Sequence, residues 1–197
     1  MLENDNFFKK YLSFKTGLKK NSGFTLVELM VVIAIIGILT AAVFMEKGNM
    51  ESTFILNKNI YKVAQDLRRV QGLAMGASKF DCLAPATTTY DIGIHFNKNQ
   101  PYYYFIFADC NGSKKKDSSD KIIEKIHLDK AKISSLAYGL GSVQKLNIVF
   151  VPPEPKVYIN TKEWDPAKEG GIKICPISDC SKEKEITINN AGRIEIK

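Results

Sequence analysis

Five oxygen-bearing side chains follow one another closely in the middle of the sequence, at a spacing that could hold a metal ion. Positions 1, 3, 5, 9 and 12 of a twelve-residue window are Asp109, Asn111, Ser113, Asp117 and Asp120. This is the ligand spacing of a Ca²⁺-binding loop, in which position 6 is normally glycine and position 12 glutamate. Here those positions are lysine and aspartate, and two further lysines follow that would repel a cation. The mismatches favour a solvated loop, so calcium is the only cofactor that the sequence leaves open.

Four cysteines are the second group of reactive side chains. Cys175 and Cys180 enclose the stretch PISD, and a disulfide could close this loop if their Cα atoms lie within about 7 Å. Cys82 and Cys110 could form a second pair, although four cysteines allow three connectivities and free thiols are the alternative. The CxxC pairs of a zinc site are absent. The sequence therefore favours at least one disulfide without fixing its partners.

Catalytic motifs are missing from the sequence. The two histidines, His95 and His127, fall in segments that we expect to be strands, and neither is near a recognisable nucleophile. The sequence contains no glycine-rich phosphate loop, nucleophile elbow or HExxH motif. We therefore expect that the chain is not an enzyme.

The net charge of +7 is divided between a short N-terminal segment and the rest of the chain. Residues 1–23 contain five lysines and two acidic residues, a balance of +3, and the remainder has 23 basic and 19 acidic residues, a balance of +4. A balance this small does not by itself argue for nucleic-acid binding. The length of 197 residues allows one ordinary domain with an appendage.

One long apolar run, FTLVELMVVIAIIGILTAAVFM, occupies residues 24–45 and contains a single acid, Glu28. As a helix it would extend roughly 33 Å, which is enough to cross a hydrocarbon core of about 30 Å. The lysines before it predict that the N-terminal end is cytoplasmic and that the rest of the chain is exported. A carboxylate within such a run costs on the order of 2.5–3.5 kcal/mol and usually has a partner. The run is long for a secretory signal, and a plain signal anchor gives the acid no use.

The stretch GFTLVELMVVIAIIGILTAAV resembles the N-terminal signature of type IV pilins and type II secretion pseudopilins. The resemblance implies that a membrane peptidase cuts between Gly23 and Phe24 and that the new N-terminus, Phe24, is methylated. Glu28 then becomes the fifth residue of the mature chain and has a role in assembly. The amine freed on Phe24 of one subunit would pair with Glu28 of the next, because two charges that are costly in hydrocarbon neutralise each other.

Helical spacing continues beyond this run. Apolar residues at steps of four and three are Leu56, Ile60, Val63, Leu67, Val70, Ala74 and Ala77. We predict one long helix over residues 24–78, apolar all round in its first half and amphipathic in its second, with this stripe docked on the following domain.

Alternating apolar residues then predict strands in eight segments: TTTYDIGIHF, YYYFIFA, KIIEKIHL, KLNIVFV, KVYIN, GIKIC, KEITIN and GRIEIK. The residues Asn189, Asn190, Ala191 and Gly192 are typical of a final hairpin turn. Strands that follow a single helix predict an α+β fold, in which the long helix packs against an antiparallel β-sheet domain.

The segments DLRRVQGLAMGASKF, YDIGIHF, YYYFIFADCNGS and ITINNAGRIEI are similar, in this order, to segments of GspH/FimT-type minor pseudopilins. This resemblance implies a leader at 1–23, a transmembrane and assembly helix at 24–45, its amphipathic continuation at 46–78 and an exported β-rich domain at 79–197. The chain would be a minor subunit of a type IV pilus or of a type II secretion pseudopilus, anchored by a single pass in the cytoplasmic membrane before assembly. Its partners would be other pilin subunits, the prepilin peptidase, the inner-membrane assembly platform and the membrane.

DNA capture during uptake is the alternative function. Some relatives in the minor-pilin branch bind DNA through basic residues near the C-terminal turn, where this chain has Arg193 and Lys197. Those relatives have a second arginine where this chain has Glu195, and a local acid weakens binding to phosphate. A solvated strand end is the favoured interpretation.

Overall fold

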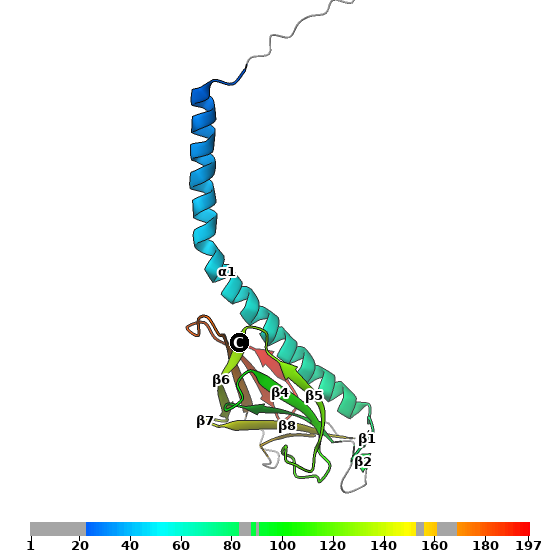
Figure 1. Cartoon of the computed structure of the whole chain (residues 1–197). Helices are drawn as coiled ribbons and strands as arrows, with labels where there is room; N and C mark the ends of the chain where they lie inside the picture. The colour runs from blue at the N-terminus through cyan, green and yellow to red at the C-terminus, as the bar shows by residue number, and fades with distance from the viewer. Residues whose placement is uncertain (1–22, 83–87, 90, 153–155, 161–168) are drawn as a thin grey trace, which may run out of the picture. The chain divides into compact units, whose positions relative to one another are not determined.

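The computed structural model describes residues 23–82, 88–89, 91–152, 156–160 and 169–197, so the expected leader lies outside the described residues except for Gly23. The chain divides into two compact units, Met1–Glu46 and Lys47–Lys197. In chain order the described elements are α1 (Leu26–Met75), β1 (Phe80–Asp81), β2 (Thr88–Thr89), β3 (Ile92–Asn97), β4 (Tyr103–Ala108), β5 (Lys121–His127), β6 (Ala131–Tyr138), β7 (Gly141–Ser142), β8 (Lys145–Val151), β9 (Lys156–Ile159), β10 (Glu169–Pro176), β11 (Lys184–Asn189) and β12 (Ile194–Ile196) (Figure 1).

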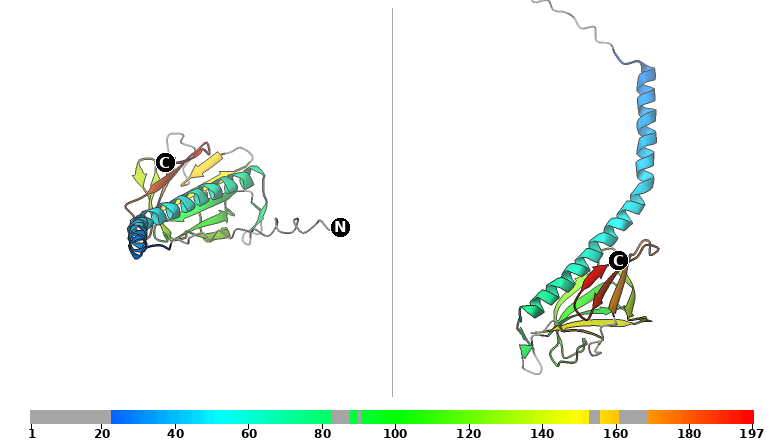
Figure 2. Two further views of the ribbon diagram at one scale, coloured as in Figure 1. Left: turned by 90° about the horizontal axis from the view of Figure 1, so that it is seen from above. Right: turned by 180° about the vertical axis from the view of Figure 1, so that it is seen from behind.

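The strands form two five-stranded antiparallel sheets. One has the order β5-β4-β3-β8-β9 and the other β12-β11-β10-β6-β7, while β1 and β2 pair with each other. The second part of α1 lies across the strands, as the view from above shows (Figure 2). One hydrophobic core is shared by this part of the helix and both large sheets. The predicted α+β fold with a helix on antiparallel sheet is confirmed.

The apolar stripe of α1 forms the helical side of this core. Its buried members are Leu56, Ile60, Val63, Ala64, Leu67, Val70 and Ala74. The sequence predicted all of these residues except Ala64. It also predicted Ala77, which is not buried. Ala77 is exposed, because the helix ends at Met75 and not at residue 78.

The end of α1 is closed by a Schellman motif. The Ser78 N–H donates to Leu73 O at 3.1 Å and the Ala77 N–H donates to Ala74 O at 2.9 Å, which satisfies two carbonyls of the last turn. Ala77 takes the left-handed position of the motif, with φ of 47°. Glycine is the usual residue there, because a Cβ makes this conformation unfavourable.

Two buried polar contacts fix the position of the helix on the sheets. The Tyr104 hydroxyl donates to Asp66 Oδ2 at 2.5 Å from within β4. The Asn59 side chain donates to Asp129 O at 2.8 Å and accepts from Asp129 N at 3.1 Å, at the turn between β5 and β6. Buried polar groups need such partners, so each contact favours a single helix position.

The sequence pattern did not predict β6, although this strand lies inside its sheet, between β10 and β7. Its pairing with β10 shifts at one point, where Lys173 faces Ser135 but the next residue, Ile174, faces Ile133. Ser134 is therefore an extra residue in β6, and such a bulge changes which side of the strand the following residues face. The alternation of apolar residues is interrupted by the same irregularity.

The predicted final turn is confirmed between β11 and β12. Gly192 N–H donates to Asn189 O at 2.9 Å, and the Asn189 side chain accepts from Ala191 N and Arg193 N. Gly192 has φ of 78°, a conformation that glycine adopts without strain.

Candidate processing and assembly site

The expected cleavage position lies in exposed, non-helical chain. Gly23 and Phe24 precede the first residue of α1, and 90% of the Phe24 side chain is exposed. Among the described residues, no heavy atom outside Gly23 and its chain neighbours lies within 4 Å of a Cβ added at Gly23. A protease needs an extended and accessible segment, and the described structure leaves this one open.

Thr25 and Glu28 close the start of α1 with a reciprocal capping box. Glu28 N–H donates to Thr25 Oγ1 at 3.2 Å, while Thr25 N–H donates to Glu28 Oε2 at 2.9 Å. The Thr25 hydroxyl also donates to the same carboxylate oxygen at 2.9 Å. In this motif two backbone N–H groups that the helix itself cannot satisfy find side-chain acceptors. Glu28 therefore helps to begin the helix in which it lies.

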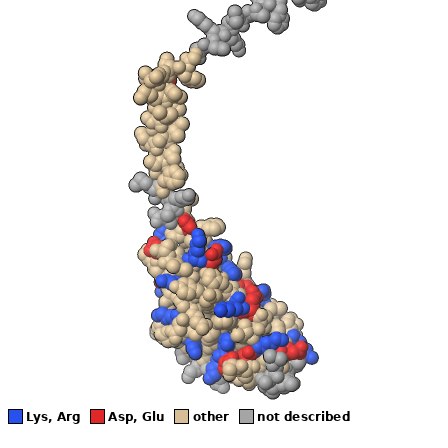
Figure 3. All heavy atoms as spheres, in the orientation of Figure 1, with Lys and Arg blue, Asp and Glu red and all other residues tan. Residues whose placement is uncertain are grey.

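The first part of α1 offers apolar side chains in every direction. Leu26–Phe44 is long and apolar enough to cross a membrane, and none of it is buried within the chain. Apart from Glu28 near its start, this segment has no charged residue, and a space-filling view shows it almost entirely tan (Figure 3). The Thr40 hydroxyl donates to Ile36 O at 2.6 Å, so it needs no water. A helix that is hydrophobic all round must bury its surface in lipid or against other helices.

The comparison with known families decides what this segment is. Residues 18–44 match the prokaryotic N-terminal methylation motif. The chain carries the N-terminus of a type IV pilin-like protein or pseudopilin. The match covers less than half of the chain, and comparisons with curated proteins and with solved structures gave no match.

The methylation motif indicates, in general terms, what this pilin-like chain associates with. It implies association with other pilins and with a prepilin peptidase, and the apolar helix implies anchoring in a membrane. The expected roles of Gly23, Phe24 and Glu28 remain predictions, which the exposed cleavage position and the capped helix start accommodate.

Both disulfides of the pilin-like domain join cysteines that the sequence singles out. Cys82 pairs with Cys110, with Cα atoms 5.8 Å apart, and ties the chain after α1 to the end of β4. Cys175 pairs with Cys180, with Cα atoms 5.0 Å apart, and closes the loop between β10 and β11. The sequence left the connectivity open, and only the fold brings Cys82 and Cys110 together.

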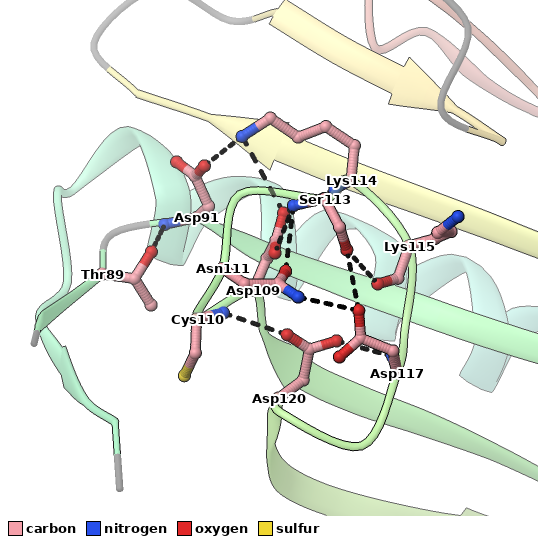
Figure 4. A network of polar contacts seen from close by, with 10 residues as sticks. All are labelled: Thr89, Asp91, Asp109, Cys110, Asn111, Ser113, Lys114, Lys115, Asp117 and Asp120. Carbon is pink, nitrogen blue, oxygen red and sulfur yellow. Dashed lines mark hydrogen bonds and ion pairs between the residues drawn. The ribbon is translucent and has the colours of Figure 1, made fainter. Parts of the chain in front are cut away.

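The loop of the calcium-like spacing is held together by its own hydrogen bonds (Figure 4). Asp109 accepts from Ser113 N and Lys114 N at 3.0 and 2.8 Å. Asp120 accepts from the backbone N–H of Cys110 at 3.0 Å and of Asp117 at 2.8 Å. These carboxylates bind backbone donors, which is the role of acidic residues in a turn and does not require an ion.

The other side chains of this loop are engaged in the same way. Asn111 donates to Asp117 Oδ2 at 2.9 Å, and the Ser113 hydroxyl contacts the same oxygen at 3.2 Å. Hydrogen bonds from Ser119 and Asn111 lower the pKa of Asp117 to about 2. Burial raises the pKa of Asp120. A calcium ion would have to replace several of these bonds, so the calcium hypothesis gains no support from the geometry.

A lysine lies beside Asp109, the first expected ligand of the loop. Lys114, with φ of 60°, forms an ion pair with Asp91, and its Nζ lies 3.8 Å from Asp109 Oδ2. Among the described residues, the only three His, Cys, Asp or Glu side chains close enough together to share a metal ion are Cys175, Cys180 and Glu183. The two sulfurs of that group are already joined in a disulfide and are not available as thiolates.

The two histidines are placed as ordinary strand residues. His95 in β3 is buried, and its Nδ1 lies 2.7 Å from Asn147 Oδ1 in β8. Burial lowers the pKa of His95, because the charged form loses its hydration. His127 in β5 lies edge-on to the Tyr103 ring, with centroids 5.0 Å apart.

The basic residues near the C-terminus are both paired with acids. Arg193 Nε donates to Glu195 Oε1 at 2.7 Å, so the local acid foreseen in the sequence binds it directly. Lys197 Nζ lies 3.7 Å from Glu169 Oε2. Paired cations bind phosphate less well, because the acid must first be displaced or left beside the phosphate.

Proposed function

We propose that this chain is a minor pilin or pseudopilin of the GspH/FimT kind, cut between Gly23 and Phe24, methylated on Phe24 and assembled into a type IV pilus or a type II secretion pseudopilus. Before assembly it is a single-pass protein of the cytoplasmic membrane with an exported β-rich domain. The matched methylation motif, which contains a helix segment with no burial inside the described chain, supports this proposal.

The assembly step follows from the surface of this segment. Because none of this segment is buried within the described chain, its apolar side chains must leave the lipid for the helices of other subunits when a filament forms. Glu28 is held at the first helical turn by Thr25. In a filament it would pair with the amine that cleavage creates on Phe24 of a neighbouring subunit. That pairing would remove two charges from hydrocarbon and set the axial offset between subunits.

A structural role without catalysis is part of the proposal. His95 is buried against Asn147, and the acidic loop binds its own backbone. The partners would be other pilin subunits, the prepilin peptidase and an inner-membrane assembly platform. DNA capture through Arg193 and Lys197 has less support, because both side chains are paired with acids.

Mass spectrometry of the N-terminus tests the proposal directly. In cells with an active prepilin peptidase we expect a mature chain that begins with methylated Phe24, and in cells without the peptidase an intact chain from Met1. Substitution of Gly23→Ala should slow the cut, since this peptidase class reads the residue before the scissile bond. A chain that keeps residues 1–23 in the presence of the peptidase would reject the proposal.

A further inference from the structure

Apolar side chains are exposed at the end of the domain where α1 enters it. Met50 and Phe54 lie one helical turn apart on α1 and are 69% and 70% exposed, and Ile177, between β10 and β11, is 49% exposed. A hollow of about 400 Å³ separates the helix from the loop, and Ile55 and Ile177 line it. We call Met50, Phe54, Ile55 and Ile177 the entry patch.

The loop that carries Ile177 is fixed in place. The disulfide between Cys175 and Cys180 closes it, and Ile177 N–H donates to Lys130 O at 3.0 Å, in the turn before β6. A flexible loop could fold an isoleucine inward, whereas this one holds the side chain in solvent. Exposed apolar groups on a rigid surface mark contact with another apolar phase.

The position of the patch in the chain indicates which phase it meets. Met50 follows Phe44, the last residue of the candidate membrane span, by six residues. Along the helix Met50 lies about 9 Å and Phe54 about 15 Å beyond the end of the span. The patch therefore stays within reach of the membrane surface for as long as the span is in the membrane.

The size and charge of the patch fit a lipid surface better than a second protein. A stable protein interface uses about 20–30 residues a side, and the hollow is lined by six. Lys130, which lines the hollow, is paired with Glu51 at 3.2 Å, and Lys182 Nζ donates to the lining residue Ser52 at 3.5 Å. A contact driven by burial of apolar side chains in the interfacial layer needs no anionic lipid.

We propose that the entry patch rests on the outer surface of the membrane that anchors the chain, with Met50, Phe54 and Ile177 inserted among the lipid headgroups until the subunit joins a filament. This inference rests on the proposed single-pass anchor. The contact holds the domain against the membrane, and assembly must lift it off.

A fluorescent label beside the patch tests this contact in the full-length chain reconstituted in phosphatidylcholine vesicles. All four cysteines are in disulfides, so a new cysteine is the only free thiol. The label is attached at Ser178→Cys, which lines the hollow, and in a matched variant at Leu140→Cys. Leu140 is fully exposed and follows the opposite end of β6 from Lys130.

We expect spin-labelled lipid to quench the label at residue 178 at least threefold more than the label at residue 140, with iodide showing the reverse order. The variant Phe54→Ser/Ile177→Ser should lose this difference while the chain still floats with the vesicles. Adding phosphatidylglycerol should change neither result.

Two outcomes overturn the contact while leaving the anchor intact. One is a floating chain whose two labels are quenched equally. The other is protection of residue 178 that grows with the protein-to-lipid ratio, which would assign the patch to a second copy of the chain. A chain that does not float with vesicles would overturn both the anchor and the contact.

Discussion

The two parts of α1 have the same backbone conformation and opposite surroundings. In Leu26–Phe44 no side chain is buried by the rest of the chain. In the part that belongs to the domain, Ile60, Val63 and Leu67 are completely buried between the helix and the sheets. A helix can therefore form whether its apolar side chains are covered by its own domain or by surroundings outside the chain. The domain covers the apolar side chains of the second part of α1. Lipid or other subunits must cover those of the first part.

The largest effect should come from removing the charge in the first part of α1. We expect Glu28→Gln to reduce filament assembly more than about a hundredfold, since leaving one member of a buried ion pair alone costs about 3–5 kcal/mol. Glutamine can still accept the Thr25 hydrogen bonds, so membrane insertion and domain stability should not change. Immunoblots of sheared filaments against whole membranes measure this.

Thr25→Ala is the matched control for that variant. It removes the cap but keeps the carboxylate, and loss of such a cap costs about 1 kcal/mol. Assembly should persist at a reduced level. Equal loss of filaments in both variants would assign the role of Glu28 to capping and not to charge pairing.

The second prediction compares one leucine in each part of the helix. Leu67→Ala should lower the free energy of unfolding of the domain by about 2–5 kcal/mol, because Leu67 is fully buried and leaves a cavity. Leu39→Ala should leave it unchanged, because 62% of Leu39 is exposed. Chemical denaturation of the full chain in detergent micelles measures both, and a large effect of Leu39→Ala would show that the first part of α1 also packs on the domain.

The third prediction concerns the disulfides, which belong to the domain alone. Cys82 and Cys110 are separated by 28 residues and Cys175 and Cys180 by 5. The loop-entropy relation then gives about 3.5 kcal/mol for the first pair and about 2 kcal/mol for the second. Replacing each pair by serines and measuring thermal unfolding tests the order. Helicity of the membrane segment should be the same in both variants.

The smallest effect should come from the end of α1. Ala77→Gly should raise the free energy of unfolding by about 1 kcal/mol, because Ala77 has a left-handed backbone that glycine adopts more easily. Ala74→Gly, three residues earlier in the buried stripe, should lower it by a similar amount or more. If both variants are destabilised, the conformation of Ala77 is not what limits this helix end.

The spacing of apolar residues in the sequence predicted the long helix, its buried stripe and most of the strands. The stripe from Leu56 to Ala74 is seen directly in the steps of four and three, and most strands follow from alternation. Contacts between distant segments were beyond this reasoning. The pairing of Cys82 with Cys110 depends on how β4 returns towards the end of α1, and β6 was missed because Ser134 interrupts its alternation.

The roles of the site residues stay predictions, and part of the geometry around them was not foreseen. The resemblance to the pilin signature singled out Gly23, Phe24 and Glu28, and the partner expected for Glu28 was a charged group of another subunit. The Thr-x-x-Glu pattern of a capping box was present at Thr25.

The contacts of Asn59 and Tyr104 have a mechanical consequence. The apolar stripe repeats at every turn of the helix, so apolar packing alone would tolerate sliding of α1 by one turn over the sheets. The hydrogen bonds between Asn59 and Asp129 and from Tyr104 to Asp66 do not repeat along the helix. A force along the helix axis must therefore break both sets at the same time. The helix and the sheets therefore resist being slid past each other. This property suits a subunit whose helix is under tension while drag acts on its sheets.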